Sequence, residues 1–420
     1  MTRTDRSNSR LTALDSALAG GGWLSLQRLT VYSAMLVGGY LTAFVVLIAT
    51  RNGVLDTAGR PIATDFSMIW TAGRAVLAGH PEAPFSIARH GAMMRDFFGP
   101  DVGLTPWHYP PYFLPVAALL ATLPYFWALA IWLGPTFGLY LVSVLAALGK
   151  RLAPRWQVAL VAAASPAVFV NAGHGQNGFL TAFLFATGTL QLQRRPWLAG
   201  SLFALLSYKP QFMLVLPVAL LAGRHWKAIA AGCMTWLAMT LALYAWLGAS
   251  PWLAFFDSLP ETRRLTLELG ATGWEKIQTV FAAVRLIGGP IQLAYAVQVL
   301  TTAVVLIVLA RLWTSAADPR LKGAALMIAA LVSTPYSVDY DMVLLTPAIA
   351  LAVSYALEKG FVPYEISLLA LVWLTPLLAR TVAGALSLPM GPAVEILFFA
   401  WIVRRSREQG AGIPVGPVPA

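Results

Sequence analysis

Charged residues and cysteine are scarce in this sequence of 420 residues. Charged side chains make up 11% of the chain, and Cys233 is its one cysteine. A soluble domain has about a quarter of its residues charged, so this chain has too few charges to cover a water-soluble particle. The single cysteine excludes a disulfide framework and a metal site built from cysteine ligands.

Motifs that are typical of several enzyme classes are also missing. There is no Gly-x-x-x-x-Gly-Lys-Ser/Thr phosphate loop, which argues against ATP as an energy source. The chain has no Gly-x-Ser-x-Gly elbow and no histidine pair at the helical spacing of metal ligands. We therefore expect no cofactor, and a divalent metal is not expected either.

What the sequence has in excess is apolar residues, which make up 58% of the chain. At about 20 residues per membrane-spanning helix, they predict an all-α polytopic membrane protein with about 12 (11–13) spans. The predicted spans are 31–49, 125–149, 156–171, 177–193, 197–208, 210–222, 226–247, 291–312, 322–335, 340–357, 363–380 and 389–403. Proline ends a helix, so Lys209-Pro210 separates two of these segments.

The predicted spans divide the chain into three regions. Residues 1–30 form a cytoplasmic arm, 31–405 a transmembrane domain, and 406–420 a cytoplasmic tail. Long loops at 50–124 and 248–290 face the outer side, and the first is expected to carry amphipathic helices. Its segment 110–122 contains three prolines and is too short for a span, which indicates a re-entrant or surface-lying helix. A second surface helix is expected within 273–288.

The net charge of +11 has two possible meanings, nucleic-acid binding or membrane orientation. When the N-terminus is placed inside, the inner segments hold 18 of the 29 basic residues and 6 of the 18 acidic ones. The inner side then sums to +12 and the outer side to −1, which is the positive-inside pattern. No basic patch is interleaved with aromatic residues, so we expect no nucleic-acid partner.

The unusual polar motifs gather on the predicted outer side. They are Thr64-Asp65-Phe66, Trp107-His108-Tyr109-Pro110-Pro111, Asn171 to Asn177, Ser207-Tyr208-Lys209-Pro210, and Pro335 to Asp341. A site assembled from several helix ends on one face suits a membrane enzyme or the vestibule of a transporter. A purely structural membrane protein has no need of one.

Each motif has a structural and a functional interpretation. Thr64 or Asp65 could cap the amphipathic helix that follows, or Asp65 could act as a general base at the membrane surface. Lys209, an ammonium between two apolar segments, could extend to the interface or bind a phosphate.

Two turns leave similar alternatives open. Asp339 and Asp341 could cap a helix near residue 340, bind a ligand hydroxyl or hold a divalent cation. His174 and Gln176 lie in a glycine-rich turn that permits close approach of the backbone, or they are ordinary loop residues.

The ordered set of motifs resembles glycosyltransferase family 87, also described as domain of unknown function 2029. The residues that carry the resemblance are Thr64-Asp65-Phe66, Tyr109-Pro110-Pro111-Tyr112-Phe113, Gly175-Gln176-Asn177, Gly200 through Lys209-Pro210, and Pro335-Tyr336 with Tyr340-Asp341. It extends over roughly residues 31–405 and implies the fold of the GT-C membrane glycosyltransferases. The donor that it implies is a polyprenyl-phosphate sugar, usually polyprenyl-phosphomannose. The sugar passes with inversion to a lipid or glycan acceptor on the outer face.

The resemblance also assigns roles to residues. The family's catalytic aspartate maps to Asp65, and its Lys-Pro motif maps to Lys209-Pro210, so Lys209 and Tyr208 are expected at the donor phosphate. The residues expected to bind substrate are Tyr109, His174, Gln176, Asn177, Tyr336, Asp339 and Asp341. Characterised mannosyltransferase relatives have a histidine in a late outer loop, where this chain has Tyr336, Asp339 and Asp341.

These expectations describe a multi-pass protein of the bacterial inner membrane with cytoplasmic termini and a periplasmic active site. Its partners are membrane lipids, the lipid-linked sugar and the acceptor. The alternative is a transporter or flippase of lipid-linked sugars, which would use the same outer vestibule. Transporters often contain two related halves with matching broken helices, whereas this sequence has one Pro-interrupted pair and no clear second copy. An assembly or scaffold protein is a third possibility, in which Asp65 would be dispensable.

Overall fold

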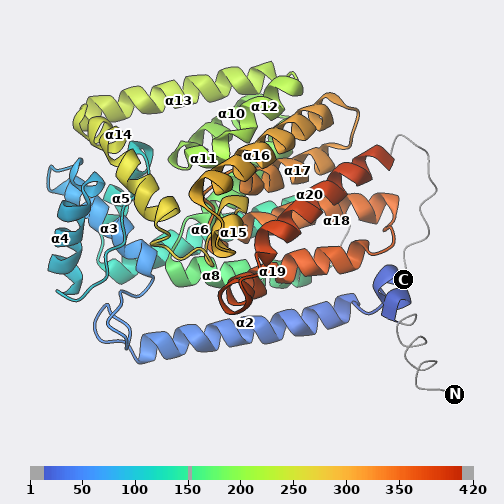
Figure 1. Ribbon diagram of the computed structural model, residues 1–420, viewed down its shortest axis with the longest axis horizontal. Coiled ribbons are helices and arrows are strands. Elements are labelled where there is room, and N and C mark those ends of the chain that lie inside the picture. Colours follow the sequence, from blue (N-terminus) through green and yellow to red (C-terminus); the bar gives the residue numbers. More distant parts are fainter. Residues whose placement is uncertain (1–13, 150–153, 409–420) are drawn as a thin grey trace.

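The computed structural model describes residues 14–149 and 154–408, and these are arranged as helices and connecting loops (Figure 1). Within these residues there is no strand, and three isolated bridges are the extended pairings found. The all-α prediction is therefore confirmed. Parts of the predicted arm 1–30 and tail 406–420, together with Lys150 and Arg151, lie outside the described residues.

Six helices of the described chain are long and apolar enough to cross a membrane. They are α2 (Leu26–Ala49), α6 (Tyr125–Leu148), α13 (Trp226–Leu247), α16 (Ile291–Thr314), η5 with α18 (Asp339–Lys359) and α19 (Glu365–Leu386). The pair α7 (Arg155–Ala163) and α8 (Pro166–His174) is bent by 56° and makes a seventh if it crosses as one span. This set is consistent with an all-α membrane protein, while the count of about 12 stays a prediction.

The remaining predicted spans correspond to shorter helices. They are α9 (Gly178–Gln191), α10 (Pro196–Ala204) with η3 (Leu205–Tyr208), α11 (Pro210–Met213) with α12 (Val215–Ala222), α17 (Pro319–Val332) and α20 (Met390–Glu408). Residues 323–332 of α17 are all buried inside the protein. Short apolar segments in a polytopic bundle can be tilted or buried among other helices, and α17 is buried in this way.

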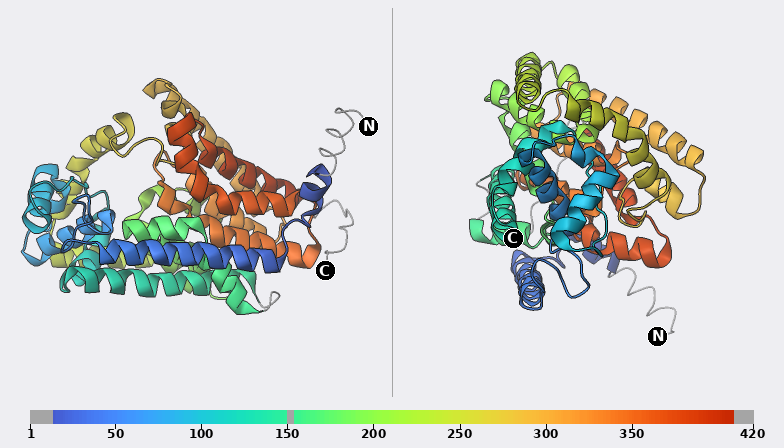
Figure 2. Two further views of the ribbon diagram at one scale, coloured as in Figure 1. Left: turned by 90° about the horizontal axis from the view of Figure 1, so that it is seen from below. Right: turned by 90° about the vertical axis from the view of Figure 1, so that its left-hand side faces the viewer.

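The first long loop and the first part of the second fold into small helices at one end of the molecule, away from the ends of the described chain, whereas α15 (Val280–Leu286) lies nearer the middle (Figures 1 and 2). We call this end of the molecule, where α3 lies, the α3 end. The first loop forms α3 (Thr64–Leu77), η1 (Ala83–Phe85), α4 (Ile87–Phe98), η2 (Pro111–Phe113) and α5 (Leu114–Ala121). The second forms α14 (Ser250–Arg263), the π-helix η4 (Arg264–Glu268) and α15 (Val280–Leu286).

The proline-rich segment 110–122 forms the short helices η2 and α5, as predicted for a segment that does not cross. At 1.5 Å per residue, α5 is about 12 Å long, well short of the bilayer core. It packs closely on α3, where a Cβ added to Gly73 would lie 2.0 Å from the carbonyl oxygen of Ala117. This contact fixes the position of α3 relative to α5 and therefore the position of Thr64 and Asp65 at the start of α3.

The surface helix expected within 273–288 is shorter than predicted. Thr279 caps α15, its hydroxyl accepting the Ala282 N–H. The preceding residues are extended instead, because Ile277 pairs with Val338 in an antiparallel bridge. The second loop is thereby tied to the segment that carries Asp339.

Candidate functional site

Asp65 is the second residue of α3, and its carboxylate turns towards the α8–α9 turn. Gln176 Nε2 donates to Asp65 Oδ2 at 2.9 Å, Thr64 Oγ1 donates to Oδ1 at 3.2 Å, and His174 Nδ1 lies 3.4 Å from Oδ1. Capping by Thr64 or Asp65 is wrong, because the N-cap is Ala63, which has a left-handed φ of 58° and gives no side-chain cap. The aspartate is therefore held by tertiary contacts.

The amide of Gln176 has one orientation consistent with its partners. Its Oε1 accepts from the Tyr109 hydroxyl at 2.8 Å and from the Asn177 N–H at 3.1 Å. Since the oxygen receives both of these donors, the NH₂ group is left to donate to Asp65. Tyr109, far away in the sequence, thus orients the group that binds the aspartate.

The turn itself depends on a glycine and an asparagine. Gly175 has φ of 66°, and a Cβ there would lie 2.6 Å from the Cβ of Phe66. Asn171 closes the turn by accepting from the Gly178 N–H at 2.8 Å and donating to the Gln176 carbonyl at 3.1 Å. Glycine is required here for both the left-handed backbone and the close approach of α3.

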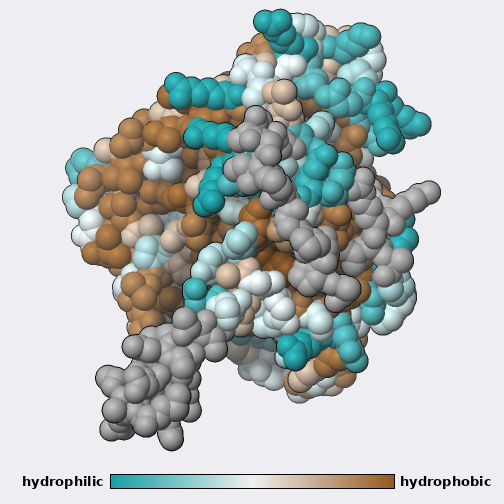
Figure 3. Space-filling view, turned by 90° about the vertical axis from the view of Figure 1, so that its right-hand side faces the viewer, coloured by the Kyte–Doolittle hydropathy of each residue, from teal (hydrophilic) through white to brown (hydrophobic). Residues whose placement is uncertain are grey.

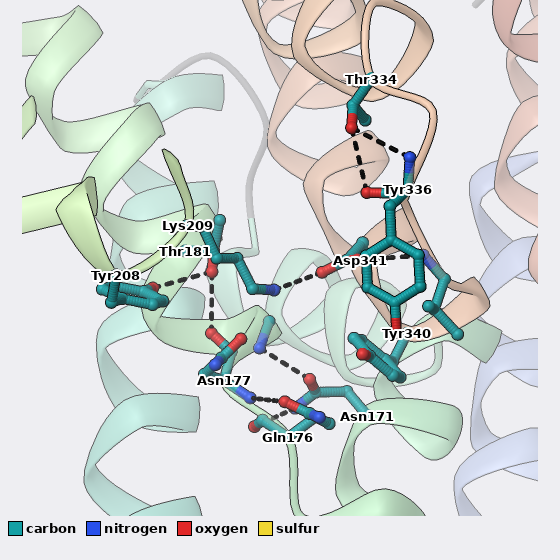
Figure 4. A network of polar contacts seen from close by, with 12 residues as sticks. Asn171, Gln176, Asn177, Thr181, Tyr208, Lys209, Thr334, Tyr336, Tyr340 and Asp341 are labelled. Carbon is teal, nitrogen blue, oxygen red and sulfur yellow. Dashed lines mark hydrogen bonds and ion pairs between the residues drawn. The ribbon is translucent and has the colours of Figure 1, made fainter. Parts of the chain in front are cut away.

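Asn177 lies at the start of α9, and Tyr208, the last residue of η3, faces it across Thr181 (Figure 4). The Tyr208 hydroxyl is 2.8 Å from Thr181 Oγ1, which donates to the Asn177 carbonyl at 3.0 Å. Asn177 is fully buried, yet neither polar atom of its side chain has a partner among the described residues. A buried amide without partners is costly, so Asn177 is an unsatisfied polar group beside Tyr208 and Thr181.

Lys209 is the residue between η3 and α11, and the predicted break at Lys209-Pro210 is confirmed. Its ammonium is buried and forms an ion pair and hydrogen bond with Asp341, while it also lies 5.5 Å from the ring centre of Tyr340. Asp341 in turn accepts the Val338 N–H at 3.0 Å, so its capping interpretation is confirmed. The cation is therefore already neutralised in this state (Figure 4).

Asp339 and Asp341 point to different partners. Asp339 lies 3.5 Å from Arg380 Nη1, and its Oδ1 accepts the Tyr340 N–H at 3.0 Å. No group of three His, Cys, Asp or Glu residues within 14–149 and 154–408 is placed to hold a metal ion. The two aspartates therefore balance two separate cations.

Electrostatics link these residues into one cluster. Burial raises the pKa of Asp65, but the hydrogen bond and charge of His174, with the hydrogen bonds from Gln176 and Thr64, bring the pKa below its ordinary value. Burial raises the pKa of Tyr109 well above its ordinary value, and the charges of Asp65 and Asp341 add to this effect. The structure thus keeps Asp65 ionised and Tyr109 protonated.

Tyr336 and His108 lie next to one another and close enough to Asp65 for its charge to affect both. Their ring centres are 6.1 Å apart. Burial lowers the pKa of His108 to about 4, although the charge of Asp65 opposes this. His108 is therefore a neutral imidazole near a carboxylate at neutral pH.

All ten residues predicted for the site lie in this connected region, but the sequence reasoning missed Arg380. Its side chain is 42% exposed, which makes it the accessible cation of the cluster. The predicted span ended at residue 380, whereas α19 continues to Leu386. The signal was an arginine within an apolar helix, which marks a functional position in membrane proteins.

The fold and this cluster define an all-helical membrane protein with three carboxylates, several hydroxyls and the two cations Lys209 and Arg380 gathered where the loops meet the helices. The sequence model of glycosyltransferase family 87 matches residues 107–338, more than half of the chain. The chain therefore belongs to glycosyltransferase family 87 and is a membrane glycosyltransferase. The matched range includes Tyr109, Lys209 and Tyr336, while Asp65 and Asp341 lie outside it. No curated protein and no solved structure matches the chain.

Proposed function

We propose that this protein transfers a sugar from a polyprenyl-phosphate donor to a lipid or glycan acceptor, with inversion and with Asp65 as the general base. The observation that carries the proposal is the setting of Asp65, ionised and fixed by His174 and Gln176. A general base must be deprotonated and within reach of the acceptor hydroxyl. The side chain of Asp65 is 19% exposed, which leaves it accessible to such a hydroxyl.

The reaction needs one displacement. Asp65 takes the proton of the acceptor hydroxyl while the acceptor oxygen forms a bond to the anomeric carbon of the sugar. The bond from that carbon to the phosphate oxygen breaks, and its electron pair leaves with the polyprenyl phosphate. One displacement at the anomeric carbon inverts its configuration, which is why a single carboxylate base suffices.

Positive charge near the departing phosphate would stabilise the transition state. Arg380 is better placed than Lys209 to meet an incoming donor phosphate, because its side chain is partly exposed. Its Nη1 lies 3.5 Å from Asp339. Lys209 is buried against Asp341, so a donor phosphate would have to share its ammonium with that carboxylate. Tyr208 and the free amide of Asn177 lie beside Lys209 and could bind phosphate or sugar oxygens.

The wider proposal follows the charge pattern and the residue types. We propose a GT-C fold in the bacterial inner membrane, with cytoplasmic termini and the Asp65 cluster on the periplasmic side. Mannose is the proposed sugar, and no metal ion or other cofactor takes part. Tyr336, Asp339 and His174 would contact substrate hydroxyls, because they border the cluster beside Asp65.

The test is a transfer assay with purified protein in detergent, radiolabelled polyprenyl-phosphomannose, and a panel of envelope lipids and glycans. We expect a labelled product, and Asp65→Asn should lower kcat by about 10²–10⁴-fold with folding retained. Asp101→Asn is the matched control, because Asp101 is an exposed aspartate of the same loop. Full activity of Asp65→Asn would refute the role of the base.

The donor and the acceptor are tested in the same assay. Polyprenyl-phosphoglucose replaces the mannosyl donor in a parallel series, and preference for it would correct the sugar. Movement of intact lipid-linked sugar across vesicles without any transfer would favour a flippase instead.

A further inference from the structure

A groove of about 530 Å³ lies between α16, α17 and α20. Both α16 and α20 pack along α17 but scarcely touch one another, so a gap is left above the buried α17. Val332 of α17, Val304 and Val308 of α16, and Phe399 of α20 line the groove. Its size falls within the range of small-molecule sites, and its lining is almost wholly apolar.

The apolar part of the groove covers about two thirds of the hydrocarbon part of one membrane leaflet. It runs along α20 from Ile396 to Val403, a rise of about 10 Å at 1.5 Å per residue. The hydrocarbon core of a bilayer is about 30 Å thick, so one leaflet accounts for about half of it. Since α16 is long and apolar enough to span the membrane, the groove lies at the depth of lipid chains.

Two arginines stand at one end of the groove. Arg404 has a side chain that is 79% exposed and pairs with Glu408, and Arg407 is exposed with no ion pair found among the described residues. Arg405 between them is different, because it is buried against Glu365. Figure 3 shows this end of the molecule, where hydrophilic side chains border a hydrophobic flank.

We propose that the groove binds an anionic glycerophospholipid, with an acyl chain along the groove and the phosphate at Arg404 and Arg407. Basic pockets between membrane helices bind anionic headgroups in this way. The site is separate from the Asp65 cluster, since α20 carries these arginines to the opposite end of the molecule from α3 (Figure 1). It would belong to the inner leaflet in the proposed orientation and does not depend on the reaction.

The test is native mass spectrometry of the delipidated full chain in mild detergent, titrated with phosphatidylglycerol or with phosphatidylcholine of the same acyl chains. We expect phosphatidylglycerol to bind about tenfold more tightly, and Arg404→Gln/Arg407→Gln to abolish the preference. Arg194→Gln/Arg195→Gln is the matched control, because it removes two exposed arginines from another turn. Equal affinities for the two lipids in the wild type would overturn the proposal, as would an unchanged preference in Arg404→Gln/Arg407→Gln.

A second variant tests the groove itself. Val304→Trp should block it and weaken the binding of both lipids, whereas Val299→Trp, on the same helix outside the lining, should not. Both side chains are more than half exposed, so the substitutions leave the packed interior intact. Displacement of the lipid by millimolar inorganic phosphate would assign the arginines to a free anion and overturn the lipid proposal.

Discussion

At the scale of single residues, Asp65 owes its position to side chains that are remote in sequence. Tyr109 fixes the amide of Gln176, and Gln176 donates to the carboxylate. His174 adds a nearby imidazole on the other oxygen. A substitution in this chain of contacts should therefore change the pKa or the orientation of the Asp65 carboxylate while the fold is retained.

The acid limb of the pH profile should report the contact between His174 and Asp65. The base acts only when deprotonated, so the rate falls as pH drops through its pKa. His174 lowers that pKa against the effect of burial, and His174→Ala should therefore move the acid limb of kcat/KM to higher pH. His174→Gln, which retains a hydrogen-bond donor, should move it less.

The control for this series is His80→Ala, since His80 is an exposed histidine of the same loop, paired with Glu82. Its acid limb should coincide with that of the wild type. A limb that stays fixed or shifts to lower pH in His174→Ala would contradict the assigned interaction.

The buried pair of Lys209 and Asp341 allows structure and donor binding to be separated. Lys209→Met leaves Asp341 buried without its partner and should cost about 3–5 kcal/mol. Lys209→Met/Asp341→Asn removes both charges, keeps an acceptor for the Val338 N–H, and should restore much of the thermal unfolding midpoint in detergent. If Lys209 binds the donor phosphate, this stable double variant should still have a raised KM for the donor.

A wild-type KM in the double variant would limit Lys209 to a structural role. Arg380→Gln is the comparison, because Arg380 is partly exposed. It should raise the donor KM without the loss of stability expected for Lys209→Met.

At the scale of elements, local patterns located helices well and their ends less well. The presence of α3 and the break at Pro210 follow from local chemistry and were predicted, but α3 begins at Thr64, the residue proposed as its cap. The capping of α3 was wrong, because the α8–α9 turn supplies partners for Asp65 from more than a hundred residues away. No local sequence pattern indicates that contact. The pairing of Ile277 with Val338 is likewise not indicated by any local pattern.

Arg380 shows a related limit. Apolar residues continue beyond it to Leu386, so α19 carries the charge within the helix. A charge normally ends a predicted span, and only the packing of α19 beside the site gives this one a partner in Asp339. The cluster could be predicted as a set of motifs, whereas its pairings could not.

The contact between α3 and α5 should control the placement of Asp65. Gly73→Ala puts a Cβ 2.0 Å from the Ala117 carbonyl oxygen, and backbone has to move. We expect a loss of about 1–3 kcal/mol of stability and a fall in kcat that approaches about 10²-fold if Asp65 shifts by 1 Å.

Gly38→Ala in α2 is the control, because a Cβ there meets nothing within 4 Å. It should leave both the unfolding midpoint and kcat unchanged. Equal behaviour of the two variants would show that the α3–α5 contact does not position the site.

At the scale of the whole molecule, the unequal charge distribution and the two ends of the fold support one orientation. The predicted inner segments sum to +12 and the outer segments to −1. The first loop, which carries Asp65, and α14 of the second loop lie at the α3 end, away from the ends of the described chain (Figures 1 and 2). This agreement holds only if the short buried helices cross the membrane together with the long ones.

Cysteine labelling from outside the cell should decide how many helices cross. In a Cys233→Ser background, twelve crossings place Thr57→Cys and Leu388→Cys outside, and Ala316→Cys and Lys359→Cys inside. Crossing by the six long helices alone would put Lys359→Cys outside, and seven crossings would put Ala316→Cys outside. We expect a membrane-impermeant maleimide to label the first pair in intact cells and the second pair only after permeabilisation. Labelling of Lys359→Cys or Ala316→Cys in intact cells would refute twelve crossings, because each crossing that is lost reverses the side of every later loop.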